Sequence, residues 1–303
     1  MMRVATIDIG SNSVRLLVAD VYQEKVVPVK TGLVTTRLGK GIGRRYLLDG
    51  PMEKTKGVLR EFLEETRQLG ALSVTAAATS AVRDATNGNE FVKMVEGELG
   101  LKIKVLSGKE EARLTYLGVL AGLHKKNVHT IVIDLGGGST EIVWPAGGDV
   151  NWESVDVGAV RATEGNYSRE KILSLLKPVL DQIDSARSLG MVGVGGTVTN
   201  LAAMAMGLKV YDSTLVHGYS LSLSKLKELL GILEVTPMEE RKKISGLQPE
   251  RADIIEAGTR IVTVIMDYLN VASMEVSEAD ILYGLALDVA QNVERKNGNT
   301  YQK

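Results

Sequence analysis

The chain has 303 residues, 44% of them hydrophobic, and its 36 Lys and Arg almost balance its 37 Asp and Glu, which leaves a net charge of −1. This balance gives no basis for bulk electrostatic binding of nucleic acid or an anionic membrane, and the absence of cysteine excludes disulfides, thiolate metal sites and a cysteine nucleophile. The N-terminal residues lack a signal-peptide layout, and no apolar run approaches the roughly 20 residues of a membrane span. We therefore expect a soluble cytoplasmic protein that binds neither nucleic acid nor membrane.

The first predicted element is a hairpin whose pattern occurs twice. Residues 6–18 and residues 132–144 each contain an apolar run, an aspartate, a turn of small residues and a second apolar run. This order is typical of a strand, a tight turn and a returning strand, with Asp8 or Asp134 where the first strand ends. The turn residues are Gly10, Ser11, Asn12 and Ser13 in the first copy and Gly136, Gly137, Gly138 and Ser139 in the second.

Small turn residues let backbone N–H groups approach an oxyanion, and a carboxylate beside them can hold a hard cation. Two such hairpins facing each other would form a phosphate clamp with Asp8 and Asp134 as metal ligands. Glu141 begins the second returning strand and is expected to point to the same side as Asp134, so the two form a plausible Mg²⁺ shell. A single turn of this kind is usually an ordinary hairpin. Its repetition over eight positions is what favours a functional interpretation.

Further elements follow the first hairpin. Asp49, Gly50 and Pro51 are typical of a helix start, and Gly70 suits the end of that helix. The patterns predict strands at residues 26–38, 73–78 and 102–106, and helices at 49–70, 90–99 and 107–122. A polar segment at 124–127 indicates a hinge, so we place a first domain at residues 1–124 and a second at 125–303, with the final helix able to pack back on the first domain.

After the second hairpin, the patterns predict helices at residues 172–187, 197–206, 224–233, 251–269 and 280–294, and strands at 191–194 and 273–276. Strands mixed with helices in this rhythm indicate an α/β fold. The repeated hairpin indicates two related lobes around one cleft.

Gly195, Gly196 and Thr197 form a turn in which a strand leads into a helix. Free N–H groups and the dipole at such a helix start bind phosphate. A purely structural glycine cluster is the alternative. The spacing fits neither a dinucleotide-binding pattern nor a Walker-type loop.

Two glutamates follow Ser107 at the start of a predicted helix. Ser107 and Glu110 have the spacing of a capping box, which gives Glu110 a structural role. Glu111 has no such role, and the helix dipole keeps it ionised, as a general base must be. Glu111 is therefore either a catalytic base or a carboxylate that only stabilises the helix.

Arg37 precedes a glycine-rich segment, and Arg83 follows a predicted strand end. Guanidinium grips phosphate in a bidentate manner, so both are candidate phosphate ligands. Solvated arginines without function are the alternative.

Together, five segments resemble the exopolyphosphatase / guanosine pentaphosphate phosphohydrolase (Ppx/GppA) family, in its short form without the C-terminal His-Asp module. They begin at Asp8, Ala78, Ser107, Asp134 and Gly193 and occur in the family's order. The resemblance implies an actin-like (ribonuclease H-like) fold with two duplicated lobes. It also implies Mg²⁺-dependent hydrolysis of terminal phosphates from inorganic polyphosphate or guanosine pentaphosphate.

Residue by residue, the resemblance maps the family's catalytic glutamate onto Glu111. Its metal and phosphate residues map onto residues 134–141, the turn at residues 10–13, Arg83 and the turn at residues 195–197. One departure lies near the C-terminus, where many members have Gly-Leu-Arg-Glu-Gly and this chain has Asp-Ile-Leu-Tyr-Gly at residues 280–284.

Two other functions fit the same residues. One is a kinase of this fold that transfers phosphate from ATP to a small acceptor. The other is a non-catalytic actin-like protein that binds polyphosphate or an alarmone. The choice between polyphosphate and guanosine pentaphosphate stays open, as does a homodimer.

Overall fold

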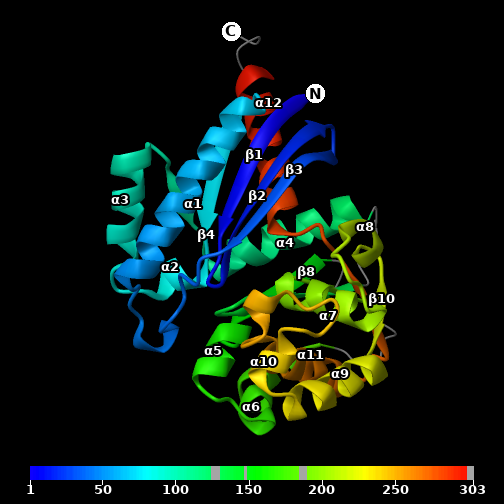
Figure 1. Ribbon diagram of the computed structural model, residues 1–303. Coiled ribbons are helices and arrows are strands. Elements are labelled where there is room, and N and C mark those ends of the chain that lie inside the picture. The colour runs from blue at the N-terminus through cyan, green and yellow to red at the C-terminus, as the bar shows by residue number, and fades with distance from the viewer. Residues whose placement is uncertain (124–129, 147–148, 184–189, 299–303) are drawn as a thin grey trace. The chain divides into compact units, whose positions relative to one another are not determined.

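The computed structural model describes residues 1–123, 130–146, 149–183 and 190–298. The chain divides into two units, each built on its own sheet (Figure 1). Unit 1 comprises Met1–Lys125 together with Ala279–Lys303, and unit 2 comprises Lys126–Glu278. The predicted hinge at 124–127 lies outside the described residues.

The sheet of unit 1 has five strands in the order β3-β2-β1-β4-β5. The first three strands of the chain form an antiparallel meander, and the last two join β1 in parallel. The strands are β1 (Met2–Ile9), β2 (Ser13–Tyr22), β3 (Lys25–Thr35), β4 (Ser73–Ala78) and β5 (Ile103–Val105).

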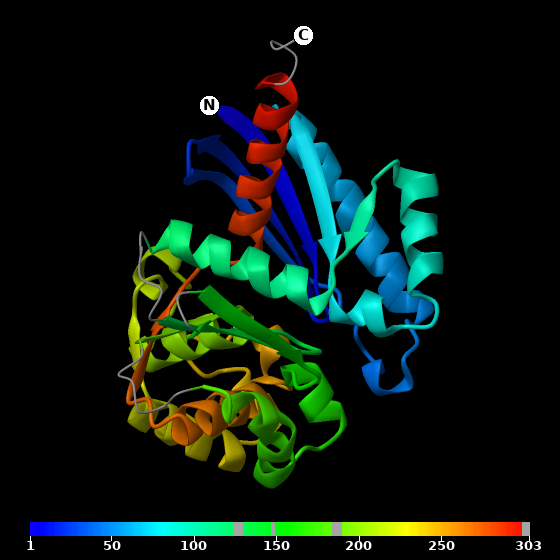
Figure 2. The same ribbon diagram turned by 180° about the vertical axis from the view of Figure 1, so that it is seen from behind.

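Helices cover both faces of this sheet (Figures 1 and 2). Ile7 and Ile9 of β1 belong to the apolar cluster that α1 (Asp49–Gln68) completes, whereas Val4 packs with α12 (Ile281–Gly298). Successive side chains of a strand point to opposite faces, so a nearly continuous apolar run is what a strand covered on both sides requires.

Helix α4 (Gly108–Gly122) crosses α12 at backbone contact. A Cβ atom on Gly118 would lie 1.9 Å from the carbonyl oxygen of Asp280, and one on Gly284 would lie 1.9 Å from that of Leu114. Only glycine fits at both positions. The crossing therefore fixes α4, and the residues at its start, to the C-terminal helix of the same unit.

Three other helical segments complete unit 1. The predicted helix at 90–99 is present as α3 (Gly88–Leu99), which packs against α1 beside the sheet. The sequence analysis did not predict the two short segments, the 3₁₀ turn η1 (Ile42–Arg44) and α2 (Ser80–Asp84). Each is shorter than the window over which helical periodicity can be recognised.

The sheet of unit 2 has six strands in the order β10-β11-β9-β6-β7-β8. Strands β6, β7 and β8 form an antiparallel meander, and β9 and β11 run parallel to β6. The strands are β6 (Thr130–Leu135), β7 (Thr140–Ala146), β8 (Asp149–Val155), β9 (Gly190–Val194), β10 (Ser220–Ser222) and β11 (Ser273–Val276).

The core of unit 2 lies between this sheet and its helices, with α11 (Ile255–Tyr268) buried along much of its length. The other helical segments are α5 (Ala159–Glu164), α6 (Arg169–Leu180), α7 (Gly196–Met206), α8 (Ser213–Val216), α9 (Leu223–Val235), α10 (Met238–Arg241) and the 3₁₀ turn η2 (Pro249–Arg251). None of the helices in the described ranges combines the length and apolar character that a membrane crossing requires.

Some predicted boundaries are wrong for local reasons. The helix predicted at 172–187 begins earlier, because the hydroxyl of Ser168 accepts the amide of Lys171 (3.2 Å) and caps α6, which ends at Leu180. The helix predicted from residue 251 begins at Ile255, after η2. Residues 184–187 of the first prediction lie outside the described residues.

Candidate active site

The first predicted hairpin is present in unit 1, with a compact turn between β1 and β2. The amide of Gly10 donates to the carbonyl of Ser13 (3.0 Å) and closes the turn. The amides of Ser11 and Asn12 at its tip have no acceptor among the described residues. A pair of uncommitted backbone N–H groups is the feature that an oxyanion site needs.

Asp8 lies at the end of β1, directly opposite Arg15 of β2. Arg15 Nε and Nη2 donate to Asp8 Oδ2 (3.0 and 2.6 Å), and Arg15 Nη1 donates to Asp280 Oδ2. The other oxygen, Asp8 Oδ1, is buried and has no hydrogen-bond partner among the described residues. Burial raises the pKa of Asp8 and the nearby Arg15 opposes that rise. The predicted metal role of Asp8 stays a prediction, and Arg15 would compete with a cation for this carboxylate.

Arg15 is a site residue that the sequence analysis missed. The sequence signal for Arg15 was its spacing of seven residues from Asp8. In a regular hairpin of this size, two residues with that spacing lie directly opposite each other.

Glu111 and Arg83 are brought together at the start of α4. Arg83 Nη1 donates to Glu111 Oε2 (2.8 Å) and also reaches the carbonyl of Leu106 (3.2 Å), while Arg83 Nε lies 3.4 Å from Asp84 Oδ1. The Glu111 side chain is buried. A guanidinium at this distance stabilises an ionised carboxylate and fixes its orientation.

Glu110 shows the predicted contrast with its neighbour. Its amide donates to Ser107 Oγ (3.3 Å), and its Oε2 accepts the amide of Ser107 (3.1 Å), so the capping box is confirmed. Lys104, together with the Ser107 cap, lowers the pKa of Glu110 to about 2. Glu110 therefore serves the helix end, and Glu111 does not take part in the cap.

The remaining predicted residues of unit 1 adjoin the first hairpin. Ser11 Oγ lies 3.0 Å from Ser80 Oγ at the start of α2, the helix that carries Arg83. The amide of Arg37 donates to the carbonyl of Asn12 (2.9 Å). Asp8, the turn at residues 10–13, Arg37, Arg83 and Glu111 are thus linked by hydrogen bonds or chain neighbours within one unit.

The second predicted hairpin is present in unit 2 with the same turn geometry. The amide of Gly136 donates to the carbonyl of Ser139 at 3.0 Å, as in the first hairpin. In the part of the chain that the structure describes, the tip amides of Gly137 and Gly138 meet no acceptor. The Gly137 carbonyl accepts the amides of Val160 and Arg161 at the start of α5 (2.8 and 3.0 Å), which holds the turn in place.

Asp134 and Glu141 face each other across β6 and β7. Both are buried, with Glu141 only 1% exposed, and Ser154 Oγ donates to Glu141 Oε1 (2.7 Å). Like charges directly opposite each other in a sheet are unfavourable, and a bound cation offsets their repulsion. Mg²⁺ typically takes one or two carboxylates and fills its other positions with water and phosphate oxygens. The pair therefore fits a divalent cation, although the described residues contain no group of three or more acidic or histidine side chains placed to hold a metal ion.

The turn at Gly195, Gly196 and Thr197 joins β9 to α7. Gly195 has φ +94°, and a Cβ atom there would lie 2.6 Å from the carbonyl oxygen of Leu135 and 3.1 Å from Asp134 Oδ1. This turn therefore lies against the base of the second hairpin. The first amides of α7 have no partner within the helix, as at any helix start.

Arg251 is a second residue that sequence reasoning missed. A Cβ atom on Gly196 would lie 2.1 Å from Arg251 Nη2, and Arg251 is only 6% exposed. Arg251 Nε donates to Gln248 Oε1 (3.0 Å). No local pattern signals this arginine, because it reaches the turn from a segment more than fifty residues away.

A profile of the Ppx/GppA phosphatase family matches residues 17–292. The chain belongs to this family. It is 32% identical to exopolyphosphatase 2 of Mycobacterium tuberculosis over 317 residues. The alignment covers 96% of this chain and 99% of that protein. The chain is 31% identical to a bifunctional 3-dehydroquinate synthase/phosphatase of Fusobacterium nucleatum over 95% of this chain, and spans only 46% of that relative.

Solved structures agree with this assignment. The crystal structure of the Aquifex aeolicus Ppx/GppA family member matches with a TM-score of 0.79 at 31% identity, over 96% of this chain and 98% of that one. An exopolyphosphatase from Cytophaga hutchinsonii matches with a TM-score of 0.86 over 95% and 98% of the two chains, and at 23% identity it supports the fold alone. The predicted family and actin-like fold are confirmed. The chain is a phosphoanhydride hydrolase.

One departure from the Ppx/GppA pattern has a structural explanation. Leu282 stands where the resemblance implied an arginine, and it is buried against Leu17 and Ala19 in the apolar layer of unit 1. Its carbonyl accepts the hydroxyl of Thr6 (3.1 Å). Position 282 therefore contributes to the packing of α12 on the sheet.

Proposed function

We propose that this protein releases orthophosphate from the terminal phosphoanhydride of inorganic polyphosphate, guanosine pentaphosphate or both. In this proposal Glu111 activates the attacking water. The glycine-rich turns at residues 10–13, 136–139 and 195–197 hold phosphate oxygens, together with Arg37 and Arg83. Asp134 and Glu141 hold Mg²⁺, with Asp8 as a further candidate ligand.

The observation that carries the proposal is the pair formed by Glu111 and Arg83. A glutamate in the first turn of a helix would ordinarily be exposed, yet Glu111 is buried and oriented by a guanidinium 2.8 Å away. Its neighbour Glu110 already provides the helix cap. A buried carboxylate that an arginine orients and that has no capping role is well placed to act as a general base.

The proposed reaction is a direct transfer of the terminal phosphoryl group to water. The water oxygen forms a bond to the terminal phosphorus, the bridging P–O bond breaks, and Glu111 takes one water proton. Orthophosphate and a chain shortened by one phosphate are the products. Turn amides and arginines stabilise the charge that spreads over the phosphoryl oxygens, which carries most of the catalysis in this chemistry.

Bound Mg²⁺ would supply further positive charge against the phosphate oxygens. Support for this cofactor comes from the buried pair of Asp134 and Glu141, which lie opposite each other. The carboxylate and amide groups of the second hairpin suit a hard cation and a phosphate together.

The test compares Glu111→Gln with Glu110→Gln. We expect Glu111→Gln to lower the rate of phosphate release by about 10²–10⁴-fold, because a primary amide cannot accept the water proton. Polyphosphate binding should stay measurable in that variant. Glu110→Gln is a matched control on the adjacent residue and should retain activity. Wild-type turnover in Glu111→Gln would remove Glu111 from the base role.

The substrate arms of the assay separate the alternatives. Phosphate release is measured from long polyphosphate, guanosine pentaphosphate and ATP, with and without Mg²⁺. A kinase of this fold would instead phosphorylate an acceptor from ATP with little free phosphate. A binding protein would retain polyphosphate or guanosine pentaphosphate without turnover. Either outcome would overturn the proposed hydrolysis.

A further inference from the structure

A basic loop connects β3 to α1 and borders the first hairpin. We define the basic loop as residues 36–48. It contains four cationic residues and no acidic one, although the chain as a whole is nearly neutral. All four cationic residues are exposed and lie within nine consecutive positions, at Arg37, Lys40, Arg44 and Arg45.

The first end of the basic loop is fastened to the tip of the hairpin. The amides of Thr36 and Arg37 donate to the carbonyl of Asn12 (3.1 and 2.9 Å), and the amide of Gly39 donates to that of Ser11 (2.7 Å). These bonds occupy carbonyl oxygens of the tip and leave its amides uncommitted. The loop therefore lies directly beside the donors proposed to hold the terminal phosphate.

The other end of the basic loop is fastened next to Arg83. Arg45 Nε donates to the carbonyl of Asp84 (3.2 Å), and the amide of Thr86 donates to the carbonyl of Arg45 (2.8 Å). Arg37 and Arg45 both adopt left-handed backbone conformations, with φ of 57° and 52°. Such conformations are costly for residues other than glycine and persist where the surroundings impose them, often at functional sites.

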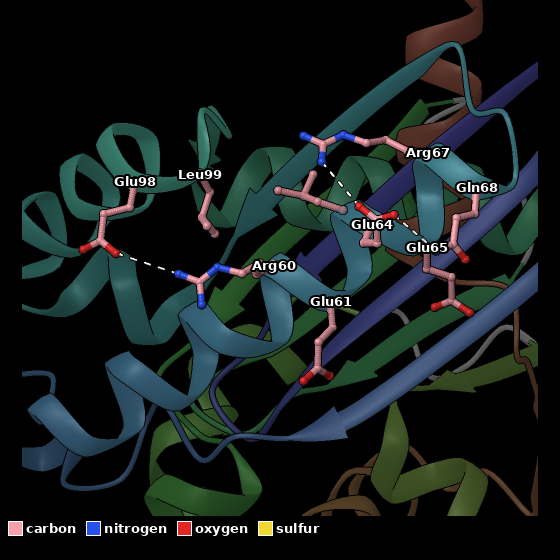
Figure 3. Close-up of a pocket in the computed structure, with 9 residues that line it drawn as sticks. Arg60, Glu61, Glu64, Glu65, Arg67, Gln68, Glu98 and Leu99 are labelled. Carbon is pink, nitrogen blue, oxygen red and sulfur yellow. Dashed lines mark hydrogen bonds and ion pairs between the residues drawn. The ribbon is translucent and has the colours of Figure 1, made fainter.

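Lys40 and Arg44 lie between these two anchors. Within the ranges that the structure covers, neither side chain forms an ion pair. A hollow on the same unit between α1 and α3 is different: there Arg60 lies 4.0 Å from Glu98, and Arg67 lies 3.6 Å from Glu64 (Figure 3). Arg60 and Arg67 are thus partly neutralised by glutamates, whereas Lys40 and Arg44 have no carboxylate partner among the residues that the structure describes.

We infer that the basic loop is a binding site for the internal phosphates of a linear inorganic polyphosphate, with Lys40 and Arg44 as its principal cations. This inference rests on the proposed function and specifies its substrate class. A polyphosphate whose terminal phosphate lies at the hairpin tip carries further negative charges into the space beside it. Each phosphate that a cation neutralises releases a bound counterion, so the gain grows with the number of contacts.

The chemistry of the basic loop favours polyphosphate over single-stranded nucleic acid. Sequence-independent binding of nucleic acid combines cations with aromatic side chains on which successive bases stack. The basic loop has one exposed aromatic residue, Tyr46. Its cations instead match a ligand made of phosphate alone.

The test uses the double variant Lys40→Gln/Arg44→Gln and compares substrates of different length. Arg45 is left unchanged because it anchors the loop. We expect KM for long polyphosphate to rise by about 10-fold, because two phosphate contacts and the counterions that they release at physiological salt are lost. KM for tripolyphosphate should change much less. The same substitutions in the Glu111→Gln background should weaken direct binding of long polyphosphate and flatten its salt dependence.

A matched control replaces two exposed arginines of the hollow in Figure 3, as Arg60→Gln/Arg67→Gln, which removes the same charge from the same unit. This control should leave the long-to-short KM ratio unchanged. An unchanged ratio in Lys40→Gln/Arg44→Gln, with wild-type hydrolysis intact, would overturn the basic-loop inference alone. Absence of polyphosphate hydrolysis by the wild type would overturn the proposed function instead. If Lys40→Gln/Arg44→Gln lost as much affinity for a single-stranded oligonucleotide as for long polyphosphate, the preference for polyphosphate would be contradicted.

Discussion

Glu141 occupies in the second hairpin the register position that Arg15 occupies in the first. Each residue lies seven positions after the aspartate of its hairpin and directly opposite it. The same backbone therefore pairs Asp8 with a cation and Asp134 with a second anion. The two similar turns therefore have different electrostatic surroundings: Asp8 faces a guanidinium across its hairpin, whereas Asp134 faces a second carboxylate, an arrangement that suits a bound cation.

The first prediction concerns Glu141→Gln. Because one of the two facing carboxylates is lost, we expect the Mg²⁺ concentration for half-maximal phosphate release to rise by about 10–100-fold, the range typical when a metal site loses a supporting group. Direct Mn²⁺ binding, followed by electron paramagnetic resonance, should weaken in parallel. Glu153→Gln on the neighbouring strand β8 is the control, since this glutamate is exposed. Equal Mg²⁺ requirements in wild type and Glu141→Gln would contradict the assignment.

The second prediction concerns Arg15, which holds two buried carboxylates. Arg15→Leu leaves Asp8 and Asp280 without their shared cation, and we expect it to lower the free energy of unfolding by about 3–5 kcal/mol. Burial raises the pKa of Asp8, so the folded state holds its proton more tightly than the unfolded state, and stability falls as pH rises through that raised pKa. The loss in Arg15→Leu should therefore be larger at neutral pH than in acid, as measured by urea unfolding.

A rescue distinguishes this explanation from a simple packing defect. The triple variant Asp8→Asn/Arg15→Leu/Asp280→Asn removes both carboxylates together with their cation, so it should recover much of the lost stability. A triple variant no more stable than Arg15→Leu would mean that the volume of the arginine, and not its charge, is what the fold requires.

The sequence predicted local features well because their causes are local. The two hairpins, the capping box of Ser107 and Glu110, and most strands are set by residues close together in the chain. The short α5 and the strand β8 were missed, because α5 has only six residues and β8 alternates apolar and polar residues over only a short stretch. Arg251 could not be predicted at the Gly196 turn, because only the packing of unit 2 brings the two segments together.

The third prediction uses the lowered pKa of Glu110. The pKa of Glu110, about 2, lies below the ordinary glutamate value. The ionised side chain therefore stabilises the folded state at pH values above that ordinary pKa, and this contribution is lost as pH falls toward 2. The side chain is more than one-third exposed, and solvent screening limits the contribution to about 1 kcal/mol. Urea unfolding should show Glu110→Gln less stable than wild type at pH 7, with the difference shrinking below about pH 4.5. A constant difference across that range would contradict the ionic cap.

The fourth prediction concerns the crossing that fixes the start of α4. In Gly118→Ala, the new methyl group would overlap the Asp280 carbonyl, so α4 and α12 must separate. We expect a loss of about 1–3 kcal/mol in the free energy of unfolding, the range for overpacking. Phosphate release should also fall, because Glu111 lies in the first turn of the displaced helix. Gly231→Ala is the control: nothing lies near its Cβ position in α9, so alanine should stabilise that helix by about 0.5–1 kcal/mol. Full activity in a destabilised Gly118→Ala would show that Glu111 keeps its position independently of the crossing.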